Sequence, residues 1–186
     1  MQLTRHFMIL ALVGLLLPAQ AQTLFKGFLN GRSEAQPVAT QAFGEVDAVL
    51  NGNELVVTGS FSGLEGEFDA NVAGGSHLHL GYAGENGPVS IVLTPTLSTD
   101  LKAGTFEAGD NTFMLDAAQL SALNERRMYV NIHTTLHPGG EIRGQLLPDA
   151  DALYYITLSG SNEVPAVVSG GSGALALEVD GDQLTV

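Results

Sequence analysis

The stretch YVNIHTTLHPGGEIRGQL, residues 129–146, decides the fold because it joins two alternating strand patterns through a turn. Apolar and polar residues alternate on each side of Pro138-Gly139-Gly140, and a period of two is typical of half-buried β-strands. The two glycines permit the backbone to bend back, so that the second strand can pair with the first. We therefore predict a β-hairpin that closes a sheet. This hairpin also carries His133 and His137, and the question is whether they bind a ligand.

Alternation of the same kind recurs along most of the chain and indicates an all-β protein. The segment 44–61 predicts a hairpin around Asn51-Gly52-Asn53, whose residues tolerate the positive φ angles of a tight turn. With 23 glycines and 15% charged residues, the composition also suits a turn-rich β domain. Further strands are predicted in 76–84, 87–97, 127–134 and 141–148, and short strands or loop in 103–115.

A single helix is predicted within residues 115–126. Leu120 and Leu123 have helical spacing, and Asp116 followed three residues later by Gln119 is typical of a capping box. The helix is short, and we expect it to bridge two strands across one end of the domain. The predicted fold class is therefore all-β, an antiparallel Greek-key sandwich or barrel with one short crossover helix.

Residues 1–21 are predicted to be a signal peptide. Arg5 precedes an apolar run over residues 7–17, and Ala19 and Ala21 fit the small-residue rule of signal peptidase, so we expect cleavage after Ala21. The run is shorter than the roughly 20 residues that a membrane helix needs, and no other segment is expected to span a bilayer. The protein is therefore expected to be secreted or periplasmic.

The charge of the exported chain restricts its partners. Removal of Arg5 leaves six of the seven basic residues against twenty acidic ones, a net charge of 6 − 20 = −14. Such a charge disfavours nucleic acid and anionic membranes and favours cations. The expected partner is an unknown extracellular protein or matrix component, or a metal ion. Because the chain has no cysteine, its stability must come from burial, for which about 165 residues suffice.

Residues 29–57 resemble residues 158–186, which predicts an internal duplication. Pro37 and Pro165 are 128 residues apart, which predicts a one-residue shift in the loop that contains them. A repeat of this length indicates that a whole domain was copied, not a solenoid unit. Three other residue pairs are each 129 apart: Glu34 and Glu163, Gly52 and Gly181, Leu55 and Leu184.

The duplication sets the expected domain organisation. We predict one β domain at residues 22–148, followed at 149–186 by a linker and an incomplete second copy, as in a piece of a longer tandem protein. The sequence Asp180-Gly181-Asp182 lacks the acidic loop of a calcium-binding EF-hand, and it fits a hairpin turn better.

Candidate metal ligands lie on the polar faces of the predicted strands. Residues two apart in a strand face the same way, so His77 and His79 share one face, as do Tyr129, Asn131 and His133. If these strands are neighbours, the imidazoles converge, and a His-x-His pair with a remote histidine is a recurring way to bind copper or zinc. Such a site needs ring nitrogens within about 4 Å of one another. The alternative is that these histidines are exposed or make structural hydrogen bonds.

His137 is the weakest candidate ligand, because it precedes Pro138 in the turn, where exposure is expected. Arg143 is expected to pair with Glu141 or Glu34 as a structural partner and not to bind an anion.

Catalytic patterns are missing from the sequence. It has no cysteine nucleophile, no Gly-x-Ser-x-Gly elbow and no glycine-rich phosphate loop before a helix. We predict a non-catalytic protein, with a copper-dependent redox activity as the only enzymatic alternative.

Two segments together resemble the CHRD domain, named after chordin: SHLHLGYAGENGPVSIVL (76–93) and LDAAQLSALNERRMYVNIHTTLHPGGEIRGQL (115–146). The shared pattern is His-x-His, Gly-Pro-Val, a leucine-rich helical segment, Tyr-Val-Asn-x-His-Thr and Pro-Gly-Gly-Glu-Ile-Arg-Gly-Gln. The family's opening pattern appears in LSGSNEVPAV and, less fully, in LNGRSEAQPV. The resemblance covers about residues 24–148 as one copy and 153–186 as the start of another.

This resemblance implies an extracellular β-sandwich or barrel of immunoglobulin-like size, found in bacterial secreted proteins and within chordin. His137 stands where the family pattern has asparagine, which weakens a ligand role for it. The histidine layout is also similar to that of copper/zinc superoxide dismutases. A bimetallic site of that kind needs more ligands than the four mature histidines provide, and its disulfide needs cysteine, so we do not expect a dismutase.

Overall fold

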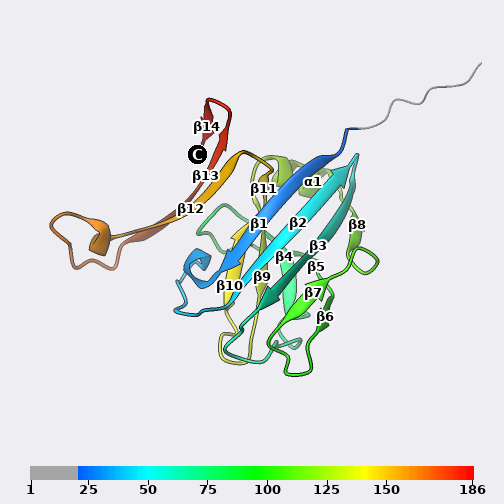
Figure 1. Ribbon diagram of the computed structural model, residues 1–186, viewed down its shortest axis with the longest axis horizontal. Coiled ribbons are helices and arrows are strands. Elements are labelled where there is room, and N and C mark those ends of the chain that lie inside the picture. Colours follow the sequence, from blue (N-terminus) through cyan, green and yellow to red (C-terminus); the bar gives the residue numbers. More distant parts are fainter. Residues whose placement is uncertain (1–20) are drawn as a thin grey trace, which may run out of the picture.

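The computed structural model describes residues 21–186, and within them the fold is all-β, as predicted (Figure 1). Apart from Ala21, the predicted signal peptide lies outside the described residues. The strands of the main domain are β1 (Thr23–Asn30), β2 (Phe43–Asn51), β3 (Glu54–Ser62), β4 (Ser76–Leu80), β5 (Val89–Val92), β6 (Pro95–Leu97), β7 (Gly104–Phe106), β8 (Thr112–Met114), β9 (Met128–Ile132), β10 (Ile142–Gln145) and β11 (Leu147–Pro148).

These eleven strands form one antiparallel sheet that curls until its ends come close. Along the sheet the order is β5-β4-β9-β10-β1-β2-β3-β7-β6, while β11 pairs with β1 and β8 pairs with β3. The end strands β5 and β6 are separated in the chain by Leu93 and Thr94 alone, so the sheet has to turn back on itself. As a result, β1–β3 form one wall and β4 and β9 lie behind them (Figure 1).

The hydrophobic core fills the space between these walls. Phe25 of β1 and Leu55 of β3 belong to the same buried cluster as Leu78 of β4 and Val130 of β9. Each of these side chains is at most 1% exposed, so the alternating apolar residues of separate strands point to one interior. Burial of such side chains stabilises the fold by roughly 2 kcal/mol each.

The predicted single strand at residues 87–97 is wrong, because the structure divides it into β5 and β6. Thr94 lies between them, where its amide donates to the Asn111 side chain at 2.8 Å and its carbonyl accepts from it at 3.0 Å. Pro95 has no amide hydrogen to continue a ladder. The buried Asn111 thus holds the chain at the point where it passes from one end of the sheet to the other.

The local turn and cap signals are confirmed. Gly52 adopts φ 64° in the β2–β3 hairpin, and Asn51 pairs with Glu54 across it. Helix α1 (Ala117–Asn124) joins β8 to β9 and has the predicted capping box between Asp116 and Gln119. Among residues 21–186, no helix combines the length and hydropathy needed to cross a membrane.

The C-terminal residues form a separate three-stranded sheet, one strand more than the two expected. Its strands are β12 (Ala152–Ser159), β13 (Ser172–Asp180) and β14 (Gln183–Thr185). Gly181 has φ 58° in the β13–β14 turn, so Asp180-Gly181-Asp182 forms the predicted hairpin. The sheet docks on the main domain: Arg126 binds Glu178 through two hydrogen bonds, and the Tyr155 hydroxyl donates to the Gln145 carbonyl at 2.8 Å.

Candidate metal centre

The strands β4 and β9 bring the candidate histidines together. They pair directly in the sheet, with His77 opposite Asn131 and His79 opposite Tyr129. The alternation of β4 turns both of its histidines to the side away from the core, where the end of β9 presents His133. The two segments are about 50 residues apart in the sequence, so only the strand order makes them neighbours.

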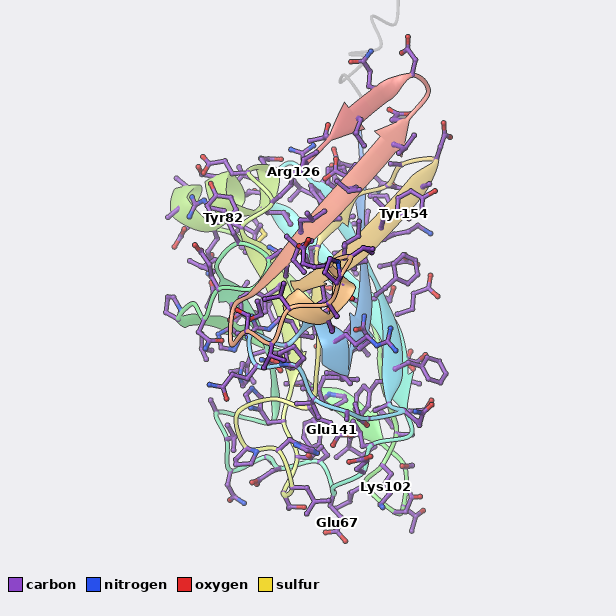
Figure 2. All side chains as sticks on the ribbon, turned by 90° about the vertical axis from the view of Figure 1, so that its left-hand side faces the viewer. Glu67, Tyr82, Lys102, Arg126, Glu141 and Tyr154 are labelled. Atoms are coloured by element: carbon purple, nitrogen blue, oxygen red, sulfur yellow. The ribbon has the colours of Figure 1, made fainter. Side chains whose placement is uncertain are left out.

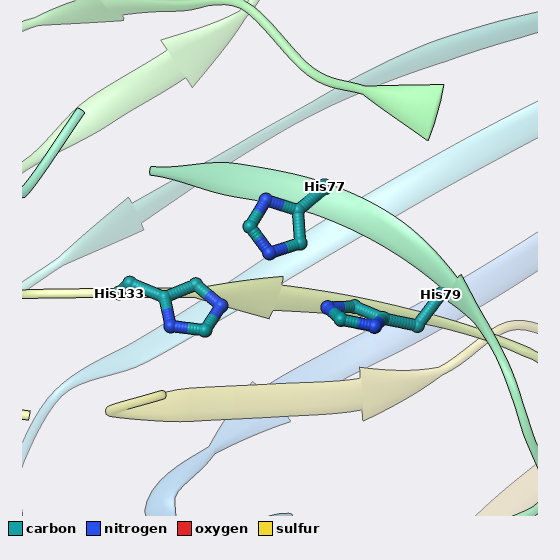
Figure 3. A group of neighbouring side chains, drawn as sticks. All are labelled: His77, His79 and His133. Atoms are coloured by element: carbon teal, nitrogen blue, oxygen red, sulfur yellow. The ribbon is translucent and has the colours of Figure 1, made fainter. Parts of the chain in front are cut away.

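Figure 3 shows the three imidazoles facing a common space, each with one ring nitrogen directed toward it. The rings of His77 and His133 are stacked with centroids 4.6 Å apart, and the centroids of His77 and His79 are also 4.6 Å apart. One nitrogen from each ring lies within 4.8 Å of the other two. The structure therefore assembles the predicted ligand set His77, His79 and His133.

Backbone carbonyls fix the orientation of two of these rings. Nδ1 of His79 donates to the Gly87 carbonyl at 2.8 Å, and Nδ1 of His133 donates to the Pro138 carbonyl at 2.9 Å. Each ring is thereby held in the tautomer whose Nε2 carries a free lone pair. Both Nε2 atoms are buried and have no hydrogen-bond partner, as is also true of Nδ1 of His77. Metal-binding histidines usually show this arrangement, with the second nitrogen bonded to a carbonyl or carboxylate.

The surroundings keep the three rings neutral. Burial, followed by the nearby His133 and His79, lowers the pKa of His77 to about 4. Burial also lowers the pKa of His79 and that of His133, and the charge of Arg143 adds to the lowering at both. A neutral imidazole is the form that coordinates a metal, so ligation is not opposed by protonation near pH 7.

The spacing fits a metal ion after a small adjustment. Two nitrogens bound at about 2.0–2.1 Å in a tetrahedral site lie roughly 3.4 Å apart. The separation of up to 4.8 Å exceeds this, and it also exceeds the limit of about 4 Å expected from the sequence. Ring movements of about 1 Å would close the difference, and the shared orientation of the rings means that no strand has to be rearranged.

A second layer of residues supports the histidines. The Tyr129 ring stacks on His79 with an interplanar angle of 1°, and the Arg143 guanidinium covers the other side of Tyr129 at 4.1 Å from the ring centroid. The Tyr129 hydroxyl accepts from the Gly87 amide at 3.1 Å. Arg143 donates to the Glu85 carbonyl at 2.8 Å. These contacts hold the loop at residues 81–88 against His79.

Of the two partners predicted for Arg143, the structure selects Glu34. Their side chains lie 3.2 Å apart and both are nearly inaccessible. Burial raises the pKa of Glu34 to about 7, although Arg143 and Asn131 lower it in part. Glu141 instead binds the amide of Glu65 and other donors in the loops. Sequence reasoning placed Tyr129 on the histidine face, but the role of the 81–88 loop has no signal in the alternation, because that loop is not a strand.

The structure does not bring His137 to the metal-ligand group. Its Nε2 lies 3.4 Å from Oε2 of Glu65, and the side chain is 27% exposed in the turn before Pro138. This placement agrees with its low rank among the candidates and makes His137 a useful control residue.

The buried titratable groups predict how the stability of the metal-free protein depends on pH. A histidine whose folded pKa is below 6.5 stabilises the fold above pH 6.5 and loses that contribution as the pH falls. Glu34 acts in the opposite sense, because its folded pKa of about 7 exceeds 4.5, so its contribution is lost as the pH rises through 7. Three histidines oppose one glutamate between pH 6.5 and 4.5, and the net effect is destabilisation by acid.

We expect the free energy of unfolding of the metal-free chain, measured in urea with a chelator, to fall by about 2 kcal/mol from pH 6.5 to pH 5. A Glu34→Gln variant should show a steeper fall, because the opposing carboxyl is removed. A flat profile between these pH values would mean that the histidines are not buried as neutral groups.

Comparison with known proteins places the chain in a family. No curated protein and no solved structure matches the sequence. The family model of the CHRD domain matches residues 25–146, which is about two thirds of the chain and includes His77, His79, His133 and the Glu34–Arg143 pair. The match does not extend to residues 153–186, so the predicted second copy stays a prediction. The main domain is a CHRD domain, and the chain belongs to the CHRD family.

Proposed function

We propose that this protein is a secreted CHRD module that binds one transition-metal ion, copper or zinc, through His77, His79 and His133. The observation that carries the proposal is the set of ring nitrogens with no partner. Nε2 of His79 and Nε2 of His133 are buried, unbonded and directed to one space beside His77. Leaving such atoms unsatisfied costs about 1–3 kcal/mol each, and a metal ion would satisfy them together.

Both candidate ions suit this donor set. Imidazole is a common ligand of zinc and copper, whereas calcium and magnesium prefer oxygen ligands. The negative charge of the chain, −13 with the signal segment included, also favours a cation.

The same geometry favours binding over catalysis. His77, His79 and His133 are only 1%, 9% and 5% exposed, so a substrate has little access to an ion held between them. A buried ion of this kind would add stability or be stored by the protein. Turnover of a substrate by the purified protein, in a screen that covers hydrolytic and copper-dependent redox reactions, would contradict this non-catalytic assignment.

Titration with zinc or copper tests the site. The metal-free chain should bind one equivalent of Zn(II) or Cu(II) with a dissociation constant on the order of micromolar or lower, measured by competition with a chromophoric chelator. His79→Ala should weaken binding at least about 100-fold, because a ligand is lost from a three-histidine set. The matched control is His137→Ala, which removes a histidine outside the group and should leave the affinity unchanged. Equal affinities of the His79→Ala variant and the parent chain would exclude the site.

Export is the other part of the proposal. CHRD domains occur in extracellular proteins, and the segment before β1 has the charge and apolar run of a signal peptide. We expect the mature protein outside the cytoplasm to begin at Gln22, which mass spectrometry of its N-terminal peptide can check. A mature chain that retains residues 1–21 would contradict it.

A further inference from the structure

The C-terminal sheet repeats the first quarter of the main domain in three dimensions. β1, the 3-10 helix η1 (Gly31–Ser33), β2 and β3 begin at residues 23, 31, 43 and 54. β12, the 3-10 helix η2 (Gly160–Asn162), β13 and β14 begin at 152, 160, 172 and 183, each 129 residues later. The strand register is the same, because Leu29 faces Gly44 and Leu158 faces Gly173.

The loops between the first two strands of each unit also coincide. The Gly31 carbonyl accepts from the Val38 amide at 2.8 Å, and the Gly160 carbonyl accepts from the Val167 amide at 2.8 Å. A Cβ atom on either glycine would collide with the carbonyl of the same valine. The two loops have equal length, so the one-residue shift expected from the prolines is wrong. Pro37 and Pro165 simply occupy adjacent positions in matching loops.

The two units differ in what covers their apolar face. Three core side chains of the first unit, Phe25, Leu29 and Leu55, are at most 1% exposed. Their counterparts 129 residues later are open to solvent: Tyr154, Leu158 and Leu184 are 52%, 48% and 62% exposed. In Figure 2, Tyr154 lies on β12 away from Arg126, which marks the side of the sheet that docks on the main domain. The apolar face is therefore directed away from its own main domain.

The edges of the second unit are open as well. In the main domain, β10 and β11 pair with β1, and β7 and β8 pair with β3. Within residues 21–186, β12 and β14 each pair with β13 alone. Glu163 is exposed and makes no ion pair there, whereas its counterpart Glu34 is buried against Arg143.

We propose that residues 152–186 are a docking unit for a second half-domain of the CHRD type, one that supplies the equivalents of β4–β11. The face, both edges and Glu163 are each open at the position where the main domain uses that half. The incoming strand at the edge of β12 would carry an arginine at the position of Arg143, and this arginine would pair with Glu163. This inference is independent of the proposed metal site.

The partner cannot be the β4–β11 half of an identical chain. Gly27 of β1 approaches β10 so closely that a Cβ atom there would lie 3.1 Å from the Leu146 side chain. The counterpart of Gly27 is Ile156, whose side chain would overlap a leucine at that place. β12–β14 therefore cannot replace β1–β3 of another copy, and the partner half needs a small residue where this chain has Leu146.

Extension of the full chain tests the docking unit. Val186 corresponds to Val57, so residues 58–148 of the same sequence are appended directly after Val186, with Leu146→Ala in the appended copy to make room for Ile156. We expect the amides of β12–β14 to exchange with deuterium at least about 100-fold more slowly than in the original chain, because both edges become paired and the apolar face is covered. Unchanged exchange in residues 152–186 would overturn the proposal.

Two controls separate docking from other effects. Leu158→Asp together with Leu184→Asp in the extended chain should abolish the added protection and leave the exchange of β1–β3 as it was. Sedimentation of the original chain tests the competing occupant, a second copy seated on the same face. A dimer that these two substitutions dissociate would show that the face is self-complementary and would overturn the proposal.

Discussion

Gly87→Ala is expected to destabilise the protein by about 3 kcal/mol and to weaken zinc binding 10- to 100-fold. A Cβ atom on Gly87 would overlap the backbone carbonyl of Leu80, and no side-chain movement can relieve a collision with backbone. The loop therefore has to shift. Its carbonyl would then leave Nδ1 of His79, and its amide would leave the Tyr129 hydroxyl.

Urea unfolding of the metal-free chain and the zinc competition assay measure the two effects separately. Gly139→Ala is the matched control, because a Cβ atom there has nothing within 4 Å, and it should change neither quantity. If Gly87→Ala keeps the parent's zinc affinity while losing stability, the Gly87 carbonyl does not orient His79 for a metal. That result would weaken the metal proposal even with the fold account intact.

Glu141→Ala is expected to lower the free energy of unfolding by about 4 kcal/mol. The Glu141 side chain is inaccessible and accepts from the Glu65 amide at 2.8 Å and from the hydroxyls of Thr40 and Thr134 at 2.9 and 2.7 Å. Figure 2 shows Glu141 among the loops at the end of the domain away from α1. Its removal would leave several donors from three different loops without an acceptor.

The direction of its pKa shift supports this role. Burial by itself would raise the pKa of Glu141, but hydrogen bonds from Glu65, Thr134 and Thr40 outweigh burial and lower it. The carboxylate is therefore more stable in the folded than in the unfolded chain. Denaturant unfolding of Glu141→Ala beside the exposed control Glu67→Ala measures the difference. A loss below about 1 kcal/mol would show that the loops do not depend on Glu141.

Local properties of the fold could be predicted from the sequence because they depend on residues close together in the chain. Alternation identified β4 and β9 and put His77 and His79 on one face, since a strand's period of two is a property of extended backbone. The Asp116 capping box and the turn at Gly52 were equally local. The 129-residue spacing likewise predicted the repeat that β12–β14 display in three dimensions.

Long-range packing decided the rest. The pairing of β4 with β9 brought His133 to the His-x-His pair, and alternation alone cannot say which strands become neighbours. The same packing chose Glu34 over Glu141 for Arg143 and divided residues 87–97 between the two ends of the sheet. The sequence by itself determined which side chains face the same way along each strand. Only the tertiary structure decided which faces meet, because strand order follows from burying the whole core at once.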